Sequence, residues 1–325
     1  MGEVLVEAKD LKKHFEVRRS PLDVILRRKS YIKAVDGIDL KIEKKQIVAL
    51  VGESGSGKTT TGRLLIMLEK PTSGEIWFDG KRIDSASPKE LRALRPRMQM
   101  IYQDPYGSLN PKLTVYQSVC EPLIVNKREH SKELVMEMLA LAGLRPPERF
   151  LERYPYQLSG GQRQRVAIAR AMILKPEFVV ADEPVSMLDV SLRAEILGVL
   201  RQFNERLGVS FLLITHDLAV ASQLAERIAV MYLGKIVEEG ATRDVLSSPL
   251  HPYTQALVSV VPRIGEEKRK KLILQGEIPS ARNIPSGCRF HPRCPYKKEV
   301  CARVEPELRR LNGVKVACHF AGELS

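Results

Sequence analysis

A glycine-rich segment that follows an apolar run limits the fold of this chain more than any other feature. Residues 52–59 read Gly-Glu-Ser-Gly-Ser-Gly-Lys-Thr and fit the pattern G-x-x-x-x-G-K-[ST], between the apolar run Val48–Val51 and a segment with helical spacing at Thr59–Leu68. Glycines allow successive backbone N–H groups to converge on phosphate oxygens, and a helix N-terminus adds a favourable dipole. The segment therefore predicts a strand, loop and helix that bind a nucleotide.

The chemistry of this loop assigns a role to two of its side chains. Lys58 is expected to reach the β- and γ-phosphates, and the Thr59 hydroxyl is expected to take one coordination position of Mg²⁺. The predicted nucleotide-binding residues of the segment are Gly52, Ser54, Gly55, Gly57, Lys58, Thr59 and Thr60.

Polar side chains follow three other short apolar runs, as expected where parallel strands end. Asp182 and Glu183 follow Phe178–Ala181; we expect Asp182 to orient Mg²⁺ and Glu183 to act as the general base for the attacking water. His216 is expected to contact the γ-phosphate, and the Gln103 amide to serve Mg²⁺ and the water. Taken singly, Asp182 and Glu183 also fit a solvated strand end, and His216 also fits a structural histidine.

A second glycine-rich element, Leu158-Ser159-Gly160-Gly161-Gln162, precedes a basic, Ala-rich helical run. Alone it is no more than a flexible Ser-Gly loop. Together with the motifs above, in this order and spacing and with Ser186-Met187-Leu188-Asp189, it resembles the ATP-binding subunit of ABC transporters over residues 1 to about 245.

The resemblance implies that this chain is an ATPase whose site is completed by a partner. In that family Ser159 and Gly161 stand at a helix N-terminus and bind the γ-phosphate of the ATP held by another subunit, and we count Gln162 among the nucleotide-binding residues. An aromatic residue near the first strands stacks on adenine in the family. Phe15 fits that place, with Tyr31 as the alternative.

Further segments resemble one branch of the family, the oligopeptide/dipeptide importers, and the second of its two ATPase subunits. Two departures from that branch, Thr59 for Ser and Met187 for Ala, leave the Mg²⁺-binding hydroxyl in place. The segments that carry the resemblance are Gly62-Arg63, Leu68–Gly74, Gln99–Pro111, Tyr232–Glu238 and His251–Thr254.

The alternation of apolar runs and helical segments predicts an α/β fold with a mainly parallel sheet. The resemblance implies a P-loop NTPase (RecA-like) core with a mixed sheet, an inserted α-helical subdomain at about 86–160, and a small Cys-rich C-terminal extension. We expect an ATPase domain over residues 1–245 and the extension over 246–325, where Pro- and Cys-rich sequence begins.

Four of the five cysteines lie near the C-terminus, with the spacing C-x₅-C-x₆-C-x₁₆-C: Cys288, Cys294, Cys301 and Cys318. This spacing matches neither a zinc ribbon nor a ferredoxin run, and four thiolates suit Zn²⁺ or a 4Fe-4S cluster equally. The resemblance favours iron–sulfur, because importer ATPases with this pattern carry such a cluster; zinc and free thiols are the alternatives. His291 and His319 are possible substitute ligands, and Cys120 is expected in the core.

Composition sets limits on partners and location. The formal net charge is +13, but the basic residues (Arg18-Arg19, Arg27-Arg28-Lys29 and Lys268-Arg269-Lys270-Lys271 among them) are scattered, so we expect no nucleic-acid partner. No apolar run spans a bilayer and the first ten residues lack a signal-peptide core, which predicts a place on the cytoplasmic face of the membrane.

The predicted assembly pairs this chain with a second, similar ATPase as a heterodimer, two transmembrane permease subunits and an extracytoplasmic substrate-binding protein. Peptides are the expected cargo, and oligosaccharides or nickel are the alternatives within the branch. The rival classes are a soluble ABC-type ATPase acting on nucleic acid, and a non-catalytic regulatory subunit, which intact Lys58, Glu183 and His216 disfavour.

Overall fold

The structure, a computed structural model, describes residues 2–17, 30–260, 274, 276–277 and 279–323, so the three basic clusters named above lie outside the described residues. The chain divides into two compact units, and each is described by itself. The first comprises Met1–Leu5, Ile42–Ile47 and Ser85–Ile214; the second comprises Val6–Lys41, Val48–Asp84 and Thr215–Ser325. The division predicted between residues 245 and 246 stays a prediction.

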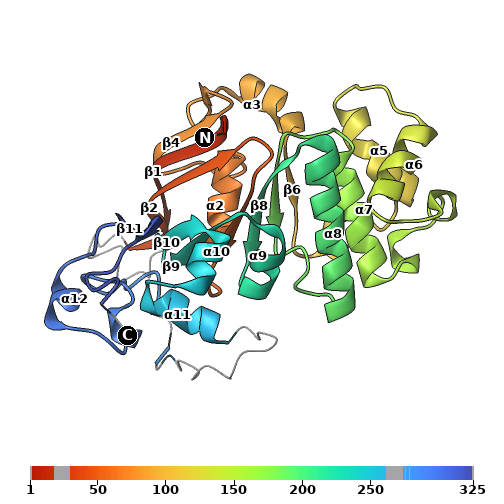
Figure 1. Cartoon of the computed structure of the whole chain (residues 1–325). Helices are drawn as coiled ribbons and strands as arrows, with labels where there is room; N and C mark the ends of the chain where they lie inside the picture. Colours follow the sequence, from red (N-terminus) through yellow and green to blue (C-terminus); the bar gives the residue numbers. More distant parts are fainter. Residues whose placement is uncertain (1, 18–29, 261–273, 275, 278, 324–325) are drawn as a thin grey trace. The chain divides into compact units, whose positions relative to one another are not determined.

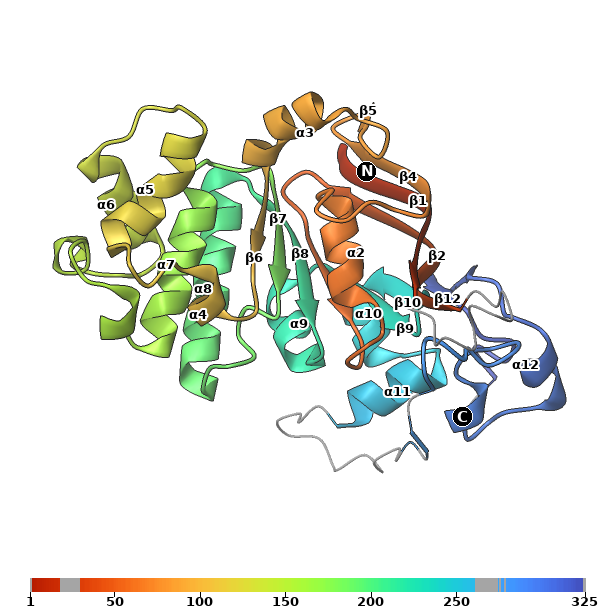
Figure 2. The same ribbon diagram turned by 180° about the vertical axis from the view of Figure 1, so that it is seen from behind.

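Parallel strands form the centre of the first unit: β6 (Met98–Ile101), β7 (Phe178–Asp182) and β8 (Ser210–Thr215) (Figure 2). Every residue of β7 and β8 is buried, as expected for parallel strands covered on both faces. Asp182 is the register partner of Ile214. The strands predicted before Asp182 and His216 are therefore confirmed as neighbours.

Helices make up the rest of the first unit. In Figure 1, α5, α6 and α7 lie side by side, and α7 and α6 also contact α8. The segment predicted to be helical also contains the strand β6, because its short run Met-Gln-Met-Ile pairs with β7. The helices are α3 (Pro88–Leu94), η1 (Arg95–Arg97), α4 (Pro105–Ser108), α5 (Val115–Val125), α6 (Lys132–Leu141), η2 (Pro147–Arg149), η3 (Pro155–Gln157), α7 (Gly160–Met172) and α8 (Val190–Leu207).

An antiparallel sheet opens the second unit, with the strand order β2 (Tyr31–Glu43), β1 (Val4–Glu16), β4 (Ser73–Phe78) and β5 (Lys81–Arg82). The predicted hairpin at Asp79-Gly80 is confirmed: β4 and β5 pair across it, and both turn residues have positive φ, 49° and 74°. This is the backbone that a two-residue hairpin turn requires.

The second unit also carries the strands β3 (Ile47–Val51), β9 (Arg227–Tyr232), β10 (Lys235–Ala241), β11 (Arg309–Leu311) and β12 (Val314–Val316). Only β3 and β9 of this group run parallel; β9 pairs antiparallel with β10, β10 with β12, and β12 with β11. The predicted parallel pairing is confirmed for β6, β7 and β8 and for β3 with β9, whereas β10 runs antiparallel to β9 because the two-residue link Leu233-Gly234 leaves it no other direction. The mixed sheet is confirmed.

Short helices complete the second unit: α2 (Lys58–Leu65), α9 (Leu218–Leu224), α10 (Thr242–Ser247), α11 (Pro252–Ser259), η4 (His291–Arg293) and α12 (Glu299–Arg303). Across the described residues of both units, none of the helices combines the length and the apolar character needed to cross a bilayer.

Candidate nucleotide-binding and cysteine sites

The glycine-rich loop of residues 52–57 joins β3 to α2, as predicted. Gly57 is the N-cap of α2 with φ 108°, and a Cβ there would lie 2.1 Å from the carbonyl oxygen of Ala34. Only glycine fits this close approach without strain. Gly57 thus lets the chain turn closely into the N-terminus of α2, the type of helix end that binds anions.

Lys58 lies against its own loop. Its Nζ donates to the carbonyl oxygens of Gly52 at 2.6 Å and Glu53 at 2.9 Å, and its side chain is buried. Ser54 and Gly55 are exposed, and Thr59 is half-buried. The ammonium group is thus held at the loop by backbone acceptors, for which phosphate oxygens are the natural replacement.

In the first unit the carboxylates follow β7. Asp182 is buried, and Glu183 adopts φ 47°, a left-handed conformation that is costly for a residue with a side chain and is concentrated at functional sites. The Glu183 N–H donates to the Ile214 carbonyl at 2.9 Å. Gln103 Nε2 donates to Ser186 Oγ at 3.5 Å, and that hydroxyl donates to the Glu183 carbonyl at 3.1 Å. The structure thus brings Gln103 to the Glu183 turn.

His216 and the two aromatic candidates lie in the second unit with Lys58. His216 is exposed and comes directly after β8. Phe15, on β1, is 36% exposed and has Lys13 Nζ 5.0 Å from its ring centroid; Tyr31, on β2, is 39% exposed. Both residues are thus partly exposed on the first two strands.

Ser159 and Gln162 form a reciprocal cap at the start of α7. The Ser159 hydroxyl accepts from the Gln162 N–H at 3.3 Å, and Gln162 Oε1 accepts from the Ser159 N–H at 3.1 Å. Ser159 is exposed and Gly161 is buried. The pattern S-x-x-Q signals such a capping box, a structural role for Gln162 that the sequence analysis missed.

The four clustered cysteines converge in the second unit. They line one cavity of about 20 Å³ together with His251, His291 and His319; its cysteines are Cys288, Cys294, Cys301 and Cys318. The Cys288 N–H donates to the Cys301 carbonyl at 2.8 Å, which Gly287 permits: at φ 64° its Cβ would lie 2.4 Å from that oxygen.

The cysteine cavity provides the donors of a metal site but is small. Among the described residues, no three His, Cys, Asp or Glu side chains are spaced to hold a metal ion as they stand. A volume of this size holds about one water molecule. Burial raises the pKa of Cys288 to about 11 and also raises those of Cys294 and Cys318. The donor set fits a group held by four thiolates, and binding it requires proton release and displacement of the cavity walls.

A second hollow lies on α5 in the first unit. It has a volume of about 250 Å³, and its lining is mostly apolar: Leu113, Tyr116, Gln117, Cys120, Glu121, Ile124, Val125 and His130. Ile124 is 55% exposed and Val125 73% exposed, whereas Cys120 is buried as predicted. An exposed apolar surface beside a hollow is typical of a protein-binding site.

Comparison with protein families gives two matches in this chain. The family described as ABC transporter matches residues 35–186. The family described as oligopeptide/dipeptide transporter, C-terminal region, matches residues 237–301.

Individual relatives match over nearly the full length. The chain is 42% identical to the dipeptide transport ATP-binding protein DppF of Escherichia coli, over 97% of this chain and 93% of that protein. It is 43% identical to the oligopeptide transport ATP-binding protein AppF of Bacillus subtilis, over 98% of both chains. Among solved structures, the ATP-binding cassette MJ0796, dimeric in a post-hydrolysis state with ADP and Pi, is 33% identical, with a TM-score of 0.64, over 74% of this chain and 99% of that one.

Proposed function

This chain belongs to the oligopeptide/dipeptide branch of the ABC transporter ATP-binding proteins, and we propose that it supplies ATP hydrolysis to a membrane importer of oligopeptides or dipeptides. The observation that carries the proposal is the full-length match to peptide-transport ATPases, which includes the C-terminal region. ATPase activity itself follows from family membership.

Within the ATP site, each predicted residue receives one role. Lys58 exchanges the Gly52 and Glu53 carbonyls for the β- and γ-phosphates, and Phe15, or alternatively Tyr31, stacks on adenine. Thr59, Gln103 and Asp182 are each a candidate Mg²⁺ ligand, and Gln103 would also contact the attacking water; Mg²⁺ would supply charge neutralisation at the phosphates. Glu183 orients and polarises the attacking water, and His216 contacts the γ-phosphate.

The exposed start of α7 supports a dimeric assembly. Ser159 at the start of α7 is exposed, and we propose that Ser159 and Gly161 contact the ATP held by a second, similar ATPase. The dimeric cassette MJ0796 is a precedent for two such chains together. We propose a heterodimer, which closes on binding ATP and reopens after hydrolysis.

The hollow on α5 supports a permease partner. Its exposed Ile124 and Val125 offer an apolar docking surface to one of two transmembrane permease subunits. We propose that this chain lies peripherally on the cytoplasmic face of the membrane. The complex would receive its cargo from an extracytoplasmic substrate-binding protein.

For the cysteine cavity we propose a 4Fe-4S cluster, with Zn²⁺ as the alternative. Four converging thiols support a group held by four thiolates, a donor set that both a 4Fe-4S cluster and Zn²⁺ accept. Anaerobically purified protein is expected to absorb visible light and to contain iron and acid-labile sulfide. A colourless sample that contains stoichiometric zinc contradicts the cluster.

The transport proposal is tested with the assembled transporter in proteoliposomes. Glu183→Gln is expected to reduce ATP hydrolysis and ATP-driven peptide uptake by on the order of 10²–10⁴-fold, while ATP still binds. Glu205→Gln, on the exposed face of α8, is the matched control and is expected to behave as the unaltered protein. Undiminished hydrolysis in Glu183→Gln contradicts the assignment of Glu183 as the general base. Hydrolysis that peptide does not stimulate and that is not accompanied by peptide uptake contradicts the proposed cargo.

A further inference from the structure

The seven-residue loop Cys288–Cys294 carries two buried arginines, Arg289 and Arg293. Arg289 forms an ion pair with Asp36 on β2, and Arg293 forms one with Glu53 in the phosphate loop. The side chains of Arg289 and Arg293 are each 7% exposed. A buried guanidinium is stable only when it is paired, so these two contacts are a fixed part of the fold.

Arg293 holds the phosphate loop. Its Nη1 and Nη2 donate to the two oxygens of Glu53 at 2.7 and 3.1 Å. Glu53 follows Gly52 directly, and its carbonyl accepts from Lys58 Nζ. Its N–H donates to the Tyr253 hydroxyl at 2.8 Å. The second residue of the phosphate loop is therefore held at both its side chain and its backbone by the C-terminal part of the chain.

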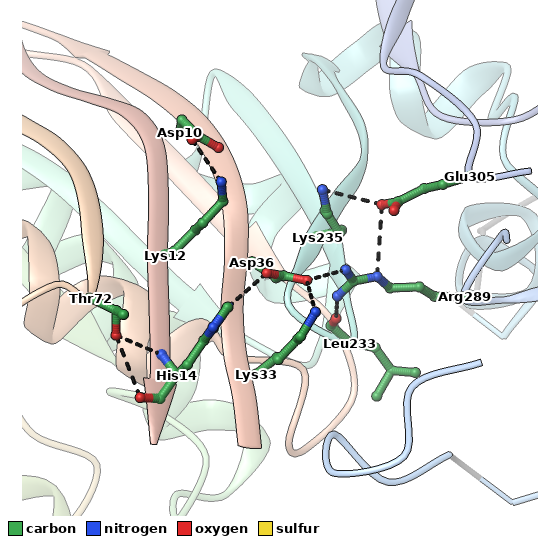
Figure 3. A network of polar contacts seen from close by, with 10 residues as sticks. All are labelled: Asp10, Lys12, His14, Lys33, Asp36, Thr72, Leu233, Lys235, Arg289 and Glu305. Atoms are coloured by element: carbon green, nitrogen blue, oxygen red, sulfur yellow. Dashed lines mark hydrogen bonds and ion pairs between the residues drawn. The ribbon is translucent and has the colours of Figure 1, made fainter. Parts of the chain in front are cut away.

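Arg289 is linked by hydrogen bonds to the two strands that carry Phe15 and Tyr31, the candidates for adenine stacking (Figure 3). Its Nη2 donates to Asp36 Oδ2 at 2.5 Å, and its Nη1 donates to the Leu233 carbonyl. The other Asp36 oxygen lies 2.7 Å from His14 Nε2, and His14 precedes Phe15 on β1. Burial raises the pKa of Asp36, but the hydrogen bonds from Arg289 and His14 outweigh it and lower the pKa to about 2.

Aromatic rings pack beside the loop through Phe290. Phe290 lies 5.3 Å from the ring of Tyr232 and 5.5 Å from that of Tyr253, and the two tyrosines are 4.8 Å apart. All three rings are fully buried. Close-packed rings transmit displacement because they leave no free volume in which it could be absorbed.

Filling the cysteine cavity has to move its walls, because the cavity holds about one water molecule. Cys288 and Cys294 are the ends of the same short loop that bears both arginines. A displacement of their sulfurs is therefore passed to the Glu53 and Asp36 pairs within three residues of chain.

We propose that Arg293 and Arg289 are positioning residues of the ATP site, and that occupancy of the four-thiol site regulates ATP affinity through the Arg293–Glu53 pair. The proposal rests on the proposed function for the two sites it links, ATP binding at the phosphate loop and a metal group at the thiols. It adds a coupling between them.

The test measures the dissociation constant of ATP for the full chain, first loaded with iron and sulfide and then stripped by chelator, with iron and zinc content determined for each sample. Stripping is expected to change ATP affinity by roughly 5- to 50-fold in the unaltered protein. In Arg293→Met, and separately in Glu53→Gln, stripping is expected to leave ATP affinity unchanged. The second variant covers the case in which the first fails to fold.

Arg303→Met is the matched control, since it removes an exposed arginine of the same region that pairs with Glu299. It is expected to keep the full coupling. Because coupling between two ligands is reciprocal, ATP is also expected to change the rate at which chelator removes the metal group, and Arg293→Met is expected to abolish that effect.

Equal ATP affinity of the loaded and stripped protein overturns the proposal, as does coupling that persists in both Arg293→Met and Glu53→Gln. A chain that retains neither iron nor zinc overturns it as well. The proposed ATPase function survives all of these outcomes, because it fails only if the unaltered protein neither binds nor hydrolyses ATP.

Discussion

The chain presents two glycine-rich helix starts, at α2 and at α7, and they are built in opposite ways. At α2, the N-cap is Gly57 and no side-chain hydrogen bond caps the helix among the described residues. Gly57 packs closely against the Ala34 carbonyl, and Lys58 is buried. At α7, Ser159 is exposed and caps the helix reciprocally with Gln162. The first start thus depends on close backbone contacts, whereas the second is stabilised by a reciprocal side-chain cap that includes an exposed serine.

The largest expected effect is a loss of ATP binding when the start of α2 is altered. Lys58→Ala removes the ammonium group that lies on the phosphate loop, so we expect the isolated chain to lose ATP affinity and kcat/KM by on the order of 10²–10³-fold. Titration with a fluorescent ATP analogue measures the binding. Lys44→Ala, an exposed lysine paired with Glu3, serves as the control. Near-normal ATP binding by Lys58→Ala would remove the basis of the comparison.

The next prediction concerns the start of α7. Ser159→Asp keeps a good helix cap but places a negative charge where the partner's γ-phosphate is proposed to bind. We expect ATPase activity of the assembled dimer to fall by on the order of 10²-fold, while the isolated chain keeps its ATP affinity and its melting temperature. If ATP affinity of the isolated chain falls as it does in Lys58→Ala, then Ser159 belongs to the same chain's site and the contrast is wrong.

Acid is expected to lower the stability of the fold through Asp36 on β2, and to leave the Ser159–Gln162 cap of α7 unchanged. The folded-state pKa of Asp36 is lowered from 3.8 to about 2, so its ionised form stabilises the fold above pH 3.8 and that contribution is lost as the pH falls toward 2. Asp36→Asn should therefore cost roughly 2 kcal/mol of unfolding free energy at pH 7, with the cost shrinking below pH 3.8. Urea denaturation at several pH values measures it.

Asp39→Asn is the control for that series, because Asp39 also lies on β2 but is exposed and accepts from the Asp10 N–H. A cost for Asp36→Asn that is independent of pH would show that the Asp36 charge contributes nothing to folding.

The smallest effect is on the cap itself. Ser159→Ala is expected to lower the unfolding free energy by about 1 kcal/mol, as is typical when a helix loses its N-cap hydroxyl. Ser131→Ala, at the N-cap of α6, should give a similar loss, whereas Ser54→Ala in the exposed part of the phosphate loop should give almost none. Thermal denaturation compares the three. A loss in Ser54→Ala equal to that in Ser159→Ala would mean that side chains also stabilise the start of α2.

Local patterns predicted the elements that carry the nucleotide chemistry. The apolar runs before Asp182 and His216 became β7 and β8, and the glycine-rich loop joins a strand to a helix. Such features depend on neighbours in sequence, which is why period and turn residues suffice to find them. The sequence analysis predicted no strand at residues 235–241, so the antiparallel β10 and its two-residue link to β9 were found only in the structure.

Contacts between distant parts of the chain were beyond sequence reasoning. Arg293 and Glu53 are 240 residues apart, and Glu53 occupies a position of the phosphate loop at which any residue satisfies the motif. The arginines between Cys288 and Cys294 have no periodicity that marks them as buried. Convergence of the four cysteines was expected from their clustering, but the size of their cavity depends on packing that no spacing reveals.

The pairing of β12 with β10 has a consequence for aggregation and for the preparation of fragments. β10 carries two buried glutamates, and Glu238 accepts from the N–H groups of Leu250 and His251 at 2.8 and 2.9 Å. A chain cut before residue 250 would lose those donors together with β12, and would expose an unpaired strand edge beside a carboxylate with unmet acceptors. Such a fragment is expected to associate with itself through β10, so the last residues of the chain also act as its protection against misassembly.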